Sequence, residues 1–183
     1  LAVEQIVKCQ SKVILCGVGK SGLIANKIAA TLSSVGTPSF YLSASDSSHG
    51  DLGSISKKDL LIIISNSGQT NELKNIIQYA NRNKITLIGI VSKKDSILYK
   101  ASDIKLLTPS VTESAGIVPT SSTVVQLALG DALSIAAIFT FANPHVYLDT
   151  MILIGSISQQ FVDLNRLLFA FGACIASFIW FFT

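Results

Sequence analysis

Short apolar runs alternate with helical periods along residues 1–137 of the chain. The run Leu60–Ile64 is short, continuous and β-branched, which predicts a strand buried on both faces. The expected strands are residues 12–18, 39–42, 60–64, 85–91 and 104–107. The expected helices lie near residues 20–34, 70–82, 95–101 and 120–137. This alternation predicts right-handed βαβ units and a parallel sheet, which is an α/β fold.

Between Leu61 and Glu72 an expected strand runs directly into a loop with three hydroxyl side chains, and a helical period follows. Gly68 allows a tight turn, and Thr70 or Asn71 can cap the helix. The N–H groups and the positive end of the helix dipole at such a helix start suit a phosphate. An ordinary turn is the alternative, but three hydroxyls around one glycine exceed what a cap requires. The expected phosphate loop consists of Ser65, Asn66, Ser67, Gly68, Gln69 and Thr70.

A second glycine-containing loop, Gly17–Gly22, follows the first expected strand and precedes a helix. Its spacing differs from the phosphate loop of nucleotide hydrolases, which has four residues between its first Gly and Gly-Lys-Ser/Thr. Its three glycines fit the dinucleotide fingerprint, but no acidic residue ends the second expected strand to contact a ribose. A lysine beside a helix N-terminus suits a phosphorylated substrate, so nucleotide binding is the weaker interpretation.

Five motifs occur in order along the chain, namely Gly17–Gly22, Gly36–Pro38, Ser48–Gly53, Ile64–Gly68 and Pro119–Thr123. Together they closely resemble the sugar isomerase (SIS) domain of the arabinose-5-phosphate isomerase family. The resemblance covers about residues 1–137. It implies a three-layer αβα sandwich with a five-stranded parallel sheet and helices on both faces. It also implies interconversion of ribulose 5-phosphate and arabinose 5-phosphate without a cofactor, and a homo-oligomer whose sites take residues from a neighbouring subunit.

Moving a carbonyl between two carbons requires a base for a carbon-bound proton, an acid for the enediol oxygens and stabilisation of charge. The resemblance assigns the catalytic roles to Lys20, His49, Glu72 and Glu113. A solvated lysine, a helix-capping histidine, a first-turn glutamate and a surface-loop carboxylate are the structural alternatives. Besides the phosphate loop, the expected substrate-binding residues are Gly19, Ser21, Gly36, Thr37, Thr120, Ser121 and Ser122.

Two histidines of the family pattern are missing from this chain. The family has a His-Pro-Gly-Gly segment after the last domain helix, where this chain has Asn143-Pro144-His145, and Ser43 replaces a second family histidine. A non-catalytic sugar-phosphate-binding module is therefore the alternative to an isomerase.

The composition changes sharply after residue 138. Residues 1–138 contain 13 Lys and Arg and 9 Asp and Glu, whereas residues 139–183 contain ten of the 14 aromatics and three charged side chains. Leu167–Thr183 is a run of 17 uncharged residues, at the lower limit for a membrane-spanning helix. We therefore expect two parts, a domain at 1–138 and an apolar helical tail at 139–183 that can associate with a membrane. A buried helix of a soluble protein is the alternative.

The tail has its own family resemblance. The block Asn143–Thr150, with Ile154–Ser156 and Phe169–Gly172, is similar to the interior of the lysine/arginine exporter family, a membrane family of about six helices. Residues 139–183 correspond to two of those helices, so the chain looks like a junction between two unrelated genes or a truncated gene product.

The remaining features bear on partners and location. A net charge of +3, dispersed along the chain, does not suggest a nucleic-acid partner. Cys9, Cys16 and Cys174 lack metal-ligand spacing, so no metal site is expected, and a buried Cys16 fits the reducing cytoplasm. Leu1 is not a natural start, so we expect the amino end to be incomplete.

Overall fold

The computed structural model describes residues 1–47 and 50–141, together with the single positions 156, 169 and 172. The chain divides into two compact units, Leu1–Phe141 and Ala142–Thr183. Every helix and strand whose bounds the structure defines lies in the first unit. Apart from positions 169 and 172, the expected tail helix at Leu167–Thr183 lies outside the described residues.

Five parallel strands form a sheet in the order β2-β1-β3-β4-β5. The strands are β1 Val13–Gly17, β2 Ser39–Ser43, β3 Leu60–Ile64, β4 Thr86–Val91 and β5 Ile104–Leu107. Each predicted strand is confirmed to within one residue at either end. The prediction succeeded because β1 and β3 are buried along their whole length, so their side chains are apolar without alternation.

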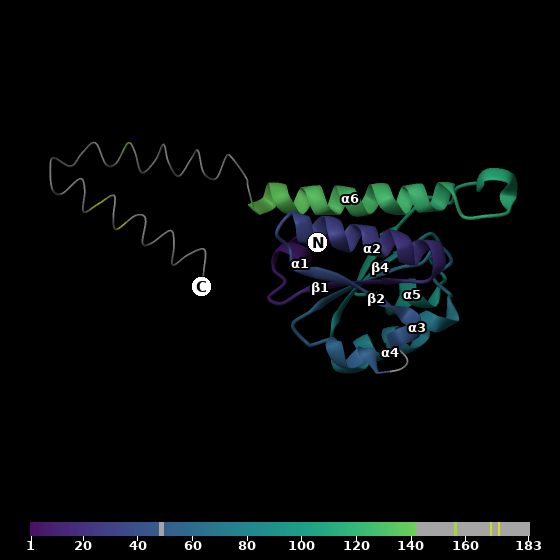
Figure 1. The fold of residues 1–183 in the computed structure, drawn as a ribbon, viewed down its shortest axis with the longest axis horizontal. Coiled ribbons are helices and arrows are strands. Elements are labelled where there is room, and N and C mark those ends of the chain that lie inside the picture. Colours follow the sequence, from purple (N-terminus) through teal and green to yellow (C-terminus); the bar gives the residue numbers. More distant parts are fainter. Residues whose placement is uncertain (48–49, 142–155, 157–168, 170–171, 173–183) are drawn as a thin grey trace. The chain divides into compact units, whose positions relative to one another are not determined.

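Helices cover both faces of the sheet, which confirms the predicted three-layer αβα sandwich (Figure 1). One face carries α1 Ala2–Val7 and α2 Gly19–Ser34, on which α6 Ser121–Phe141 packs in turn. The other face carries α3 Ala44–Ser47, α4 Lys74–Asn83 and α5 Ile97–Ala101. Three short 3-10 turns complete the order, namely η1 Asp51–Ser54, η2 Asn71–Leu73 and η3 Ser114–Gly116.

Alternate residues of the central strands supply the two cores. Ile14 and Cys16 pack on the α4–α5 side of the sheet, whereas Val13 and Leu15 pack on the α1–α2 side. Complete burial of such an aliphatic side chain contributes roughly 1.5–3 kcal/mol relative to exposure. Burial also raises the pKa of the Cys16 thiol to about 12, so this cysteine is an inert core residue, as predicted.

Helix α6 presents its small and polar side chains to the protein and several apolar ones to solvent. The buried positions are Ser122, Gln126, Gly130, Ser134 and Ala137, and the large exposed ones are Val124, Ile135 and Phe139. A Cβ atom at Gly130 would lie 2.1 Å from Cδ1 of Ile28, so α2 and α6 approach closely there. Lys27 of α2 also pairs with Asp131 of α6, with Nζ 2.6 Å from Oδ2. Within the described residues, α6 is the one helix long and apolar enough to cross a membrane.

Candidate functional site

The site lies where the sheet changes its winding direction. Strands β1 and β3 are neighbours, and Gly17 at the end of β1 pairs in register with Ile64 at the end of β3. The chain leaves β1 for α2 on one face and leaves β3 for α4 on the other. Loops 18–22 and 65–70 therefore start side by side at the carboxyl edge, the position where open α/β sheets bind ligands.

The loop at 65–70 is folded tightly around Ser65. Its buried Oγ accepts a hydrogen bond from the Gly68 amide at 3.0 Å and lies 3.0 Å from the Thr70 hydroxyl. Gly68 has a φ of +63°, a left-handed conformation that favours glycine. The Ser65 hydroxyl therefore shapes the loop from inside, and this role differs from the expected contact with a ligand.

The predicted helix cap at this loop is wrong in detail. The chain first makes the 3-10 turn η2, and α4 begins only at Lys74. Thr70 occupies the cap position without a side-chain capping bond, because its hydroxyl pairs with Ser65 instead. The loop still ends at a helix start, so the positive end of the helix dipole faces it. Ser67 and Gln69 are exposed on the loop, and the Ser67 Oγ accepts a 3.3 Å bond from the Gln69 amide.

The other loop presents Lys20 in the first turn of α2, where its side chain is exposed. Gly19 has a φ of +59°, and a Cβ atom at Gly22 would lie 2.8 Å from the Gly17 carbonyl oxygen. The Tyr41 hydroxyl donates a 3.0 Å bond to that same carbonyl. Burial raises the pKa of Tyr41, so the phenol stays protonated and can donate this bond. The bond holds the loop in place.

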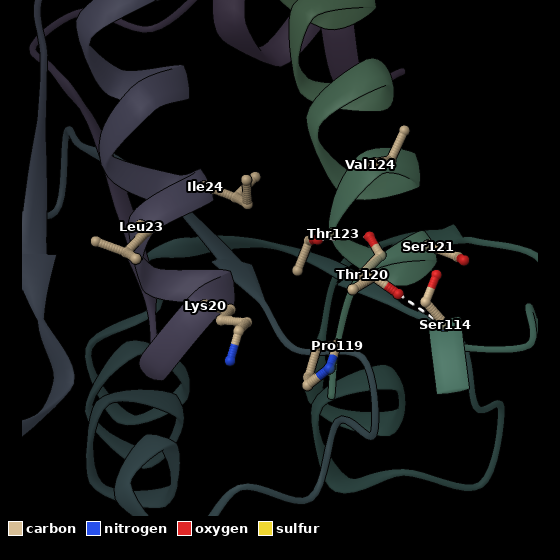
Figure 2. Close-up of a pocket in the computed structure, with 9 residues that line it drawn as sticks. All are labelled: Lys20, Leu23, Ile24, Ser114, Pro119, Thr120, Ser121, Thr123 and Val124. Carbon is tan, nitrogen blue, oxygen red and sulfur yellow. Dashed lines mark hydrogen bonds between the residues drawn. The ribbon is translucent and has the colours of Figure 1, made fainter. Parts of the chain in front are cut away.

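A groove of about 600 Å³ separates the start of α2 from the start of α6 (Figure 2). It is lined by Lys20, Leu23, Ile24, Ser114, Pro119, Thr120, Ser121, Thr123 and Val124. Beside it, the Ser21 hydroxyl donates to Oε1 of the buried Gln126 at 3.0 Å. The structure therefore brings the predicted residues of loops 18–22 and 119–122 together.

Glu113 forms the cap of α6. Its Oε2 accepts hydrogen bonds from the Thr120 amide at 2.7 Å, the Thr120 hydroxyl at 3.3 Å and the Ser122 amide at 3.3 Å. The neighbouring Ser122 hydroxyl and the Thr120 amide lower the pKa of Glu113 to about 2. A general base works best with a pKa near the operating pH, so this arrangement does not favour the predicted catalytic role for Glu113.

The Ser122 hydroxyl is unusual among the side chains that the structure describes. Its Oγ is buried and has no partner in regular hydrogen-bond geometry, although it lies close enough to Glu113 to stabilise the carboxylate charge. A buried polar atom without a partner costs free energy, roughly 1–3 kcal/mol. The interaction with the Glu113 carboxylate offsets part of this cost.

The remaining predicted site residues fall in different places. Glu72 is exposed in η2, directly after the phosphate loop. His49 lies outside the described residues. Gly36 and Thr37 are a correction, because they connect α2 to the start of β2 and so lie at the amino edge of the sheet, opposite the site. There the Thr37 amide bonds the Leu32 carbonyl, which ends α2.

Several supporting residues were not predicted, namely Tyr41, Ser92 and Gln126. The polar positions 122, 126 and 134 recur at helical spacing in a mostly apolar helix, a pattern that points to a polar buried face. No group of three or more His, Cys, Asp or Glu is placed to hold a metal ion in the described part of the chain.

Comparison with known proteins identifies the family. Residues 6–136 match the SIS domain. The chain belongs to the SIS domain family. The arabinose 5-phosphate isomerase KdsD of Yersinia pestis is 45% identical over 137 residues, which is 74% of this chain and 42% of KdsD. KdsD of Pseudomonas aeruginosa is 41% identical over 155 residues, which is 78% of this chain and 47% of that protein.

The SIS domain here therefore spans less than half the length of these curated relatives. Among solved structures, an Escherichia coli CFT073 protein in complex with arabinose 5-phosphate superposes with a TM-score of 0.73 at 37% identity. The alignment covers 76% of each chain. A phosphosugar isomerase homologue from Bacteroides fragilis gives a TM-score of 0.72 at 38% identity, covering 77% of this chain and 78% of that one.

A second family model matches the other end of the chain. Residues 103–183 match the LysE type translocator, which agrees with the exporter resemblance of the tail. This match overlaps the SIS domain match over residues 103–136, which include β5 and most of α6.

Proposed function

We propose that the chain binds a sugar phosphate at the carboxyl edge between β1 and β3 and interconverts arabinose 5-phosphate and ribulose 5-phosphate. The observation that carries the proposal is the pairing of loops 18–22 and 65–70, which contain no acidic residue and both lead into helix starts. Backbone N–H groups, exposed Ser67 and the Lys20 ammonium suit a phosphate dianion. The names of the KdsD relatives and the arabinose 5-phosphate complex of the E. coli protein support the sugar and the reaction.

In the proposed reaction a base takes the proton from C2 of the aldose while the carbonyl oxygen at C1 is protonated, which gives an enediol. Return of a proton to C1 and loss of the proton from the C2 hydroxyl give the ketose, so the step needs no oxidant. We assign the base to Glu72, because it follows the phosphate loop and is exposed. Lys20 stabilises the negative charge that develops on the oxygens. We assign ring opening to His49.

Glu113 has a positioning role in this scheme. Its charge fixes the amides of Thr120 and Ser122, and through them the start of α6 beside the groove. The low pKa of Glu113 and the serine at position 43 favour the second candidate function, a sugar-phosphate-binding module without turnover.

The assembly and location expected from the sequence remain part of the proposal. Leu23 and Val124 flank the groove and are 71% and 65% exposed, and Phe139 is 64% exposed. Exposed apolar side chains such as these support a homo-oligomer that covers them. We propose a cytoplasmic protein, and membrane association through residues 139–183 stays a prediction.

The experiment uses the full chain. Purified protein is titrated with arabinose 5-phosphate and with arabinose by calorimetry, and turnover is followed by exchange of the substrate's C2 hydrogen in deuterated water. Binding of the phosphate ester alone, with exchange, supports the isomerase. Binding of arabinose 5-phosphate without exchange supports the sugar-phosphate-binding module. If neither arabinose 5-phosphate nor arabinose binds, the proposal is rejected.

A further inference from the structure

The segment that follows β4 binds the backbone of the phosphate loop. The Ser92 amide and the Ser92 hydroxyl both donate to the Asn66 carbonyl oxygen, at 3.1 Å and 2.6 Å. Further along the same segment, the Leu98 amide of α5 donates to the Gly68 carbonyl at 3.0 Å. Two alternate carbonyls of the loop are thus bound from one side.

These bonds determine where the loop's amides point. The described peptide bonds are all trans, and in a trans peptide the N–H group points opposite to the C=O group of the same plane. Because the carbonyls of Asn66 and Gly68 face the 92–98 segment, the amides of Ser67 and Gln69 face away from it. Both residues are exposed, and on this side the Gln69 amide donates its long 3.3 Å bond to the Ser67 hydroxyl. This direction is therefore the open side of the loop.

Ser96 supports the loop from behind. Its side chain is fully buried, donates to the Lys93 carbonyl at 2.7 Å and accepts a bond from the Tyr99 amide. A Cβ atom at Gly68 would lie 2.3 Å from the Ser96 Oγ, so the loop rests directly against the N-cap of α5. Because this contact is already close, the loop cannot shift toward α5 when a ligand binds on its exposed side.

We propose that Ser92 is a positioning residue of the phosphate site, which turns the amides of Ser67 and Gln69 toward the bound phosphate by holding the Asn66 carbonyl. This inference rests on the proposed function, because it assumes that loop 65–70 binds phosphate. Ser92 itself does not touch the ligand. Its hydroxyl adds a second and shorter bond to the one from its amide, which further restricts rotation of the 66–67 peptide, so the loop is organised for an anion before the anion arrives.

The chain offers a matched control one strand away. The Thr108 amide and hydroxyl both donate to the Val91 carbonyl, at 2.7 Å and 3.1 Å, which repeats the arrangement of Ser92 on Asn66. Thr108 is buried, and its hydroxyl bonds β4 rather than loop 65–70. Thr108→Val removes an equivalent hydroxyl bond, so it measures the loss of stability without the loss of loop orientation.

The test compares Ser92→Ala, Ser92→Thr and Thr108→Val, each in the full chain, with the natural chain. Calorimetry measures the affinity for arabinose 5-phosphate and inorganic phosphate, and thermal unfolding measures stability. We expect Ser92→Ala to weaken both ligands about fivefold, the size of one lost hydrogen bond, while Ser92→Thr stays within about twofold. Thr108→Val should lower the melting temperature without changing either affinity. In nitrogen-15 spectra, phosphate should shift the Ser67 and Gln69 amides less in Ser92→Ala.

The outcomes separate this inference from the proposed function. If the natural chain binds neither ligand, the proposed function fails. If the natural chain binds both and Ser67→Ala weakens them while Ser92→Ala leaves affinity and amide shifts unchanged, the positioning role of Ser92 is wrong. Equal loss of affinity in Ser92→Ala and Thr108→Val would assign Ser92 a purely structural role and would also overturn the inference.

Discussion

The Thr120 amide donates a 2.7 Å hydrogen bond to Oε2 of Glu113, and this bond joins the loop after β5 to the first turn of α6. The glutamate accepts two further bonds from the same turn. A side chain seven residues upstream thereby acts as an N-cap, since the carboxylate satisfies amides that a helix start leaves without partners. The charge of Glu113 therefore stabilises the start of α6.

The depressed pKa of Glu113 predicts a loss of stability in acid. The pKa is about 2 in the folded chain against an ordinary 4.5, so the contribution is fully present above pH 4.5. It is lost as the pH falls from 4.5 toward 2, because the folded state must then bind the proton at a cost. Thermal unfolding of the natural chain and Glu113→Gln should converge over this interval. Curves that stay parallel from about pH 5 to about pH 2 would contradict the capping role.

The structure predicts different effects for the loss of the Ser67 and Thr70 hydroxyls of the phosphate loop. Ser67→Ala should weaken phosphate-ester binding about tenfold or more without changing stability, since a bond to a charged oxygen is worth roughly 1.5–3 kcal/mol. Thr70→Ala should weaken binding to a similar degree and also lower the melting temperature, because Thr70 bonds the buried Ser65. Ser34→Ala, at the opposite edge of the sheet, is the control. Unchanged affinity in both loop variants would remove the phosphate site from this loop.

The proposed role of Glu72 as the base predicts that its substitution lowers turnover without changing substrate affinity. Glu72→Gln keeps the size and hydrogen bonding of the side chain but removes its basicity. If the chain turns over substrate, this variant should lose most hydrogen exchange at C1 and C2 while its affinity for arabinose 5-phosphate stays within about twofold. Exchange near the natural rate would show that another group is the base.

The contact between α2 and α6 predicts that substitutions at Gly130 and Ile28 have non-additive effects on the free energy of unfolding. Gly130→Ala should destabilise the fold by about 1–3 kcal/mol through overpacking against Ile28, offset in part by the better helix propensity of alanine. Ile28→Val removes the nearest methyl group, so Gly130→Ala should cost less in that background. Denaturant unfolding of the two single variants and the double variant gives the coupling energy. Strictly additive losses would show that the two side chains do not meet.

The composition of residues 142–183 predicts that they are dispensable for binding. A chain ending at Phe141 keeps all of α6 and should be more soluble, because it lacks most of the aromatic tail. Its affinity for phosphate esters should stay within a few-fold of the full chain. A sharp fall in melting temperature with increased binding of a hydrophobic dye would instead show that the tail is part of the folded domain.

The sequence predicted the sheet well because its central strands β1, β3 and β4 are short, apolar and buried on both faces, so each can be recognised without reference to its neighbours. The edge strands β2 and β5 are partly exposed, and they were recognised from their place in the alternation of strands and helices. The loops at 18–22 and 65–70 were found for a similar reason, since each contains its own glycines and hydroxyls. Gly36 and Thr37 were misplaced because they precede a strand, and the start of a parallel strand lies at the far edge from its end.

Relationships across the fold could not be predicted from the sequence. Ser92 follows β4, and nothing local to β4 shows that its hydroxyl meets Asn66 after β3. The capping error at Thr70 has the same origin, because Ser65 competes for that hydroxyl only when the loop is closed. The capping function of Glu113 likewise depends on how the loop folds back between residues 113 and 120.

The strand order has a consequence for a chain that is made from one end. Strand β1 is the first to leave the ribosome, yet it pairs with both β2 and β3, and β3 ends only at Ile64. Until then one side of β1 is an open edge, where unpaired backbone N–H and C=O groups on an apolar strand can pair with another nascent chain. The residues Leu60–Ile64 close that edge, and the loop that directly follows them lies beside the loop of Lys20. Protection of β1 from aggregation and the pairing of loops 18–22 and 65–70 therefore depend on the same strand.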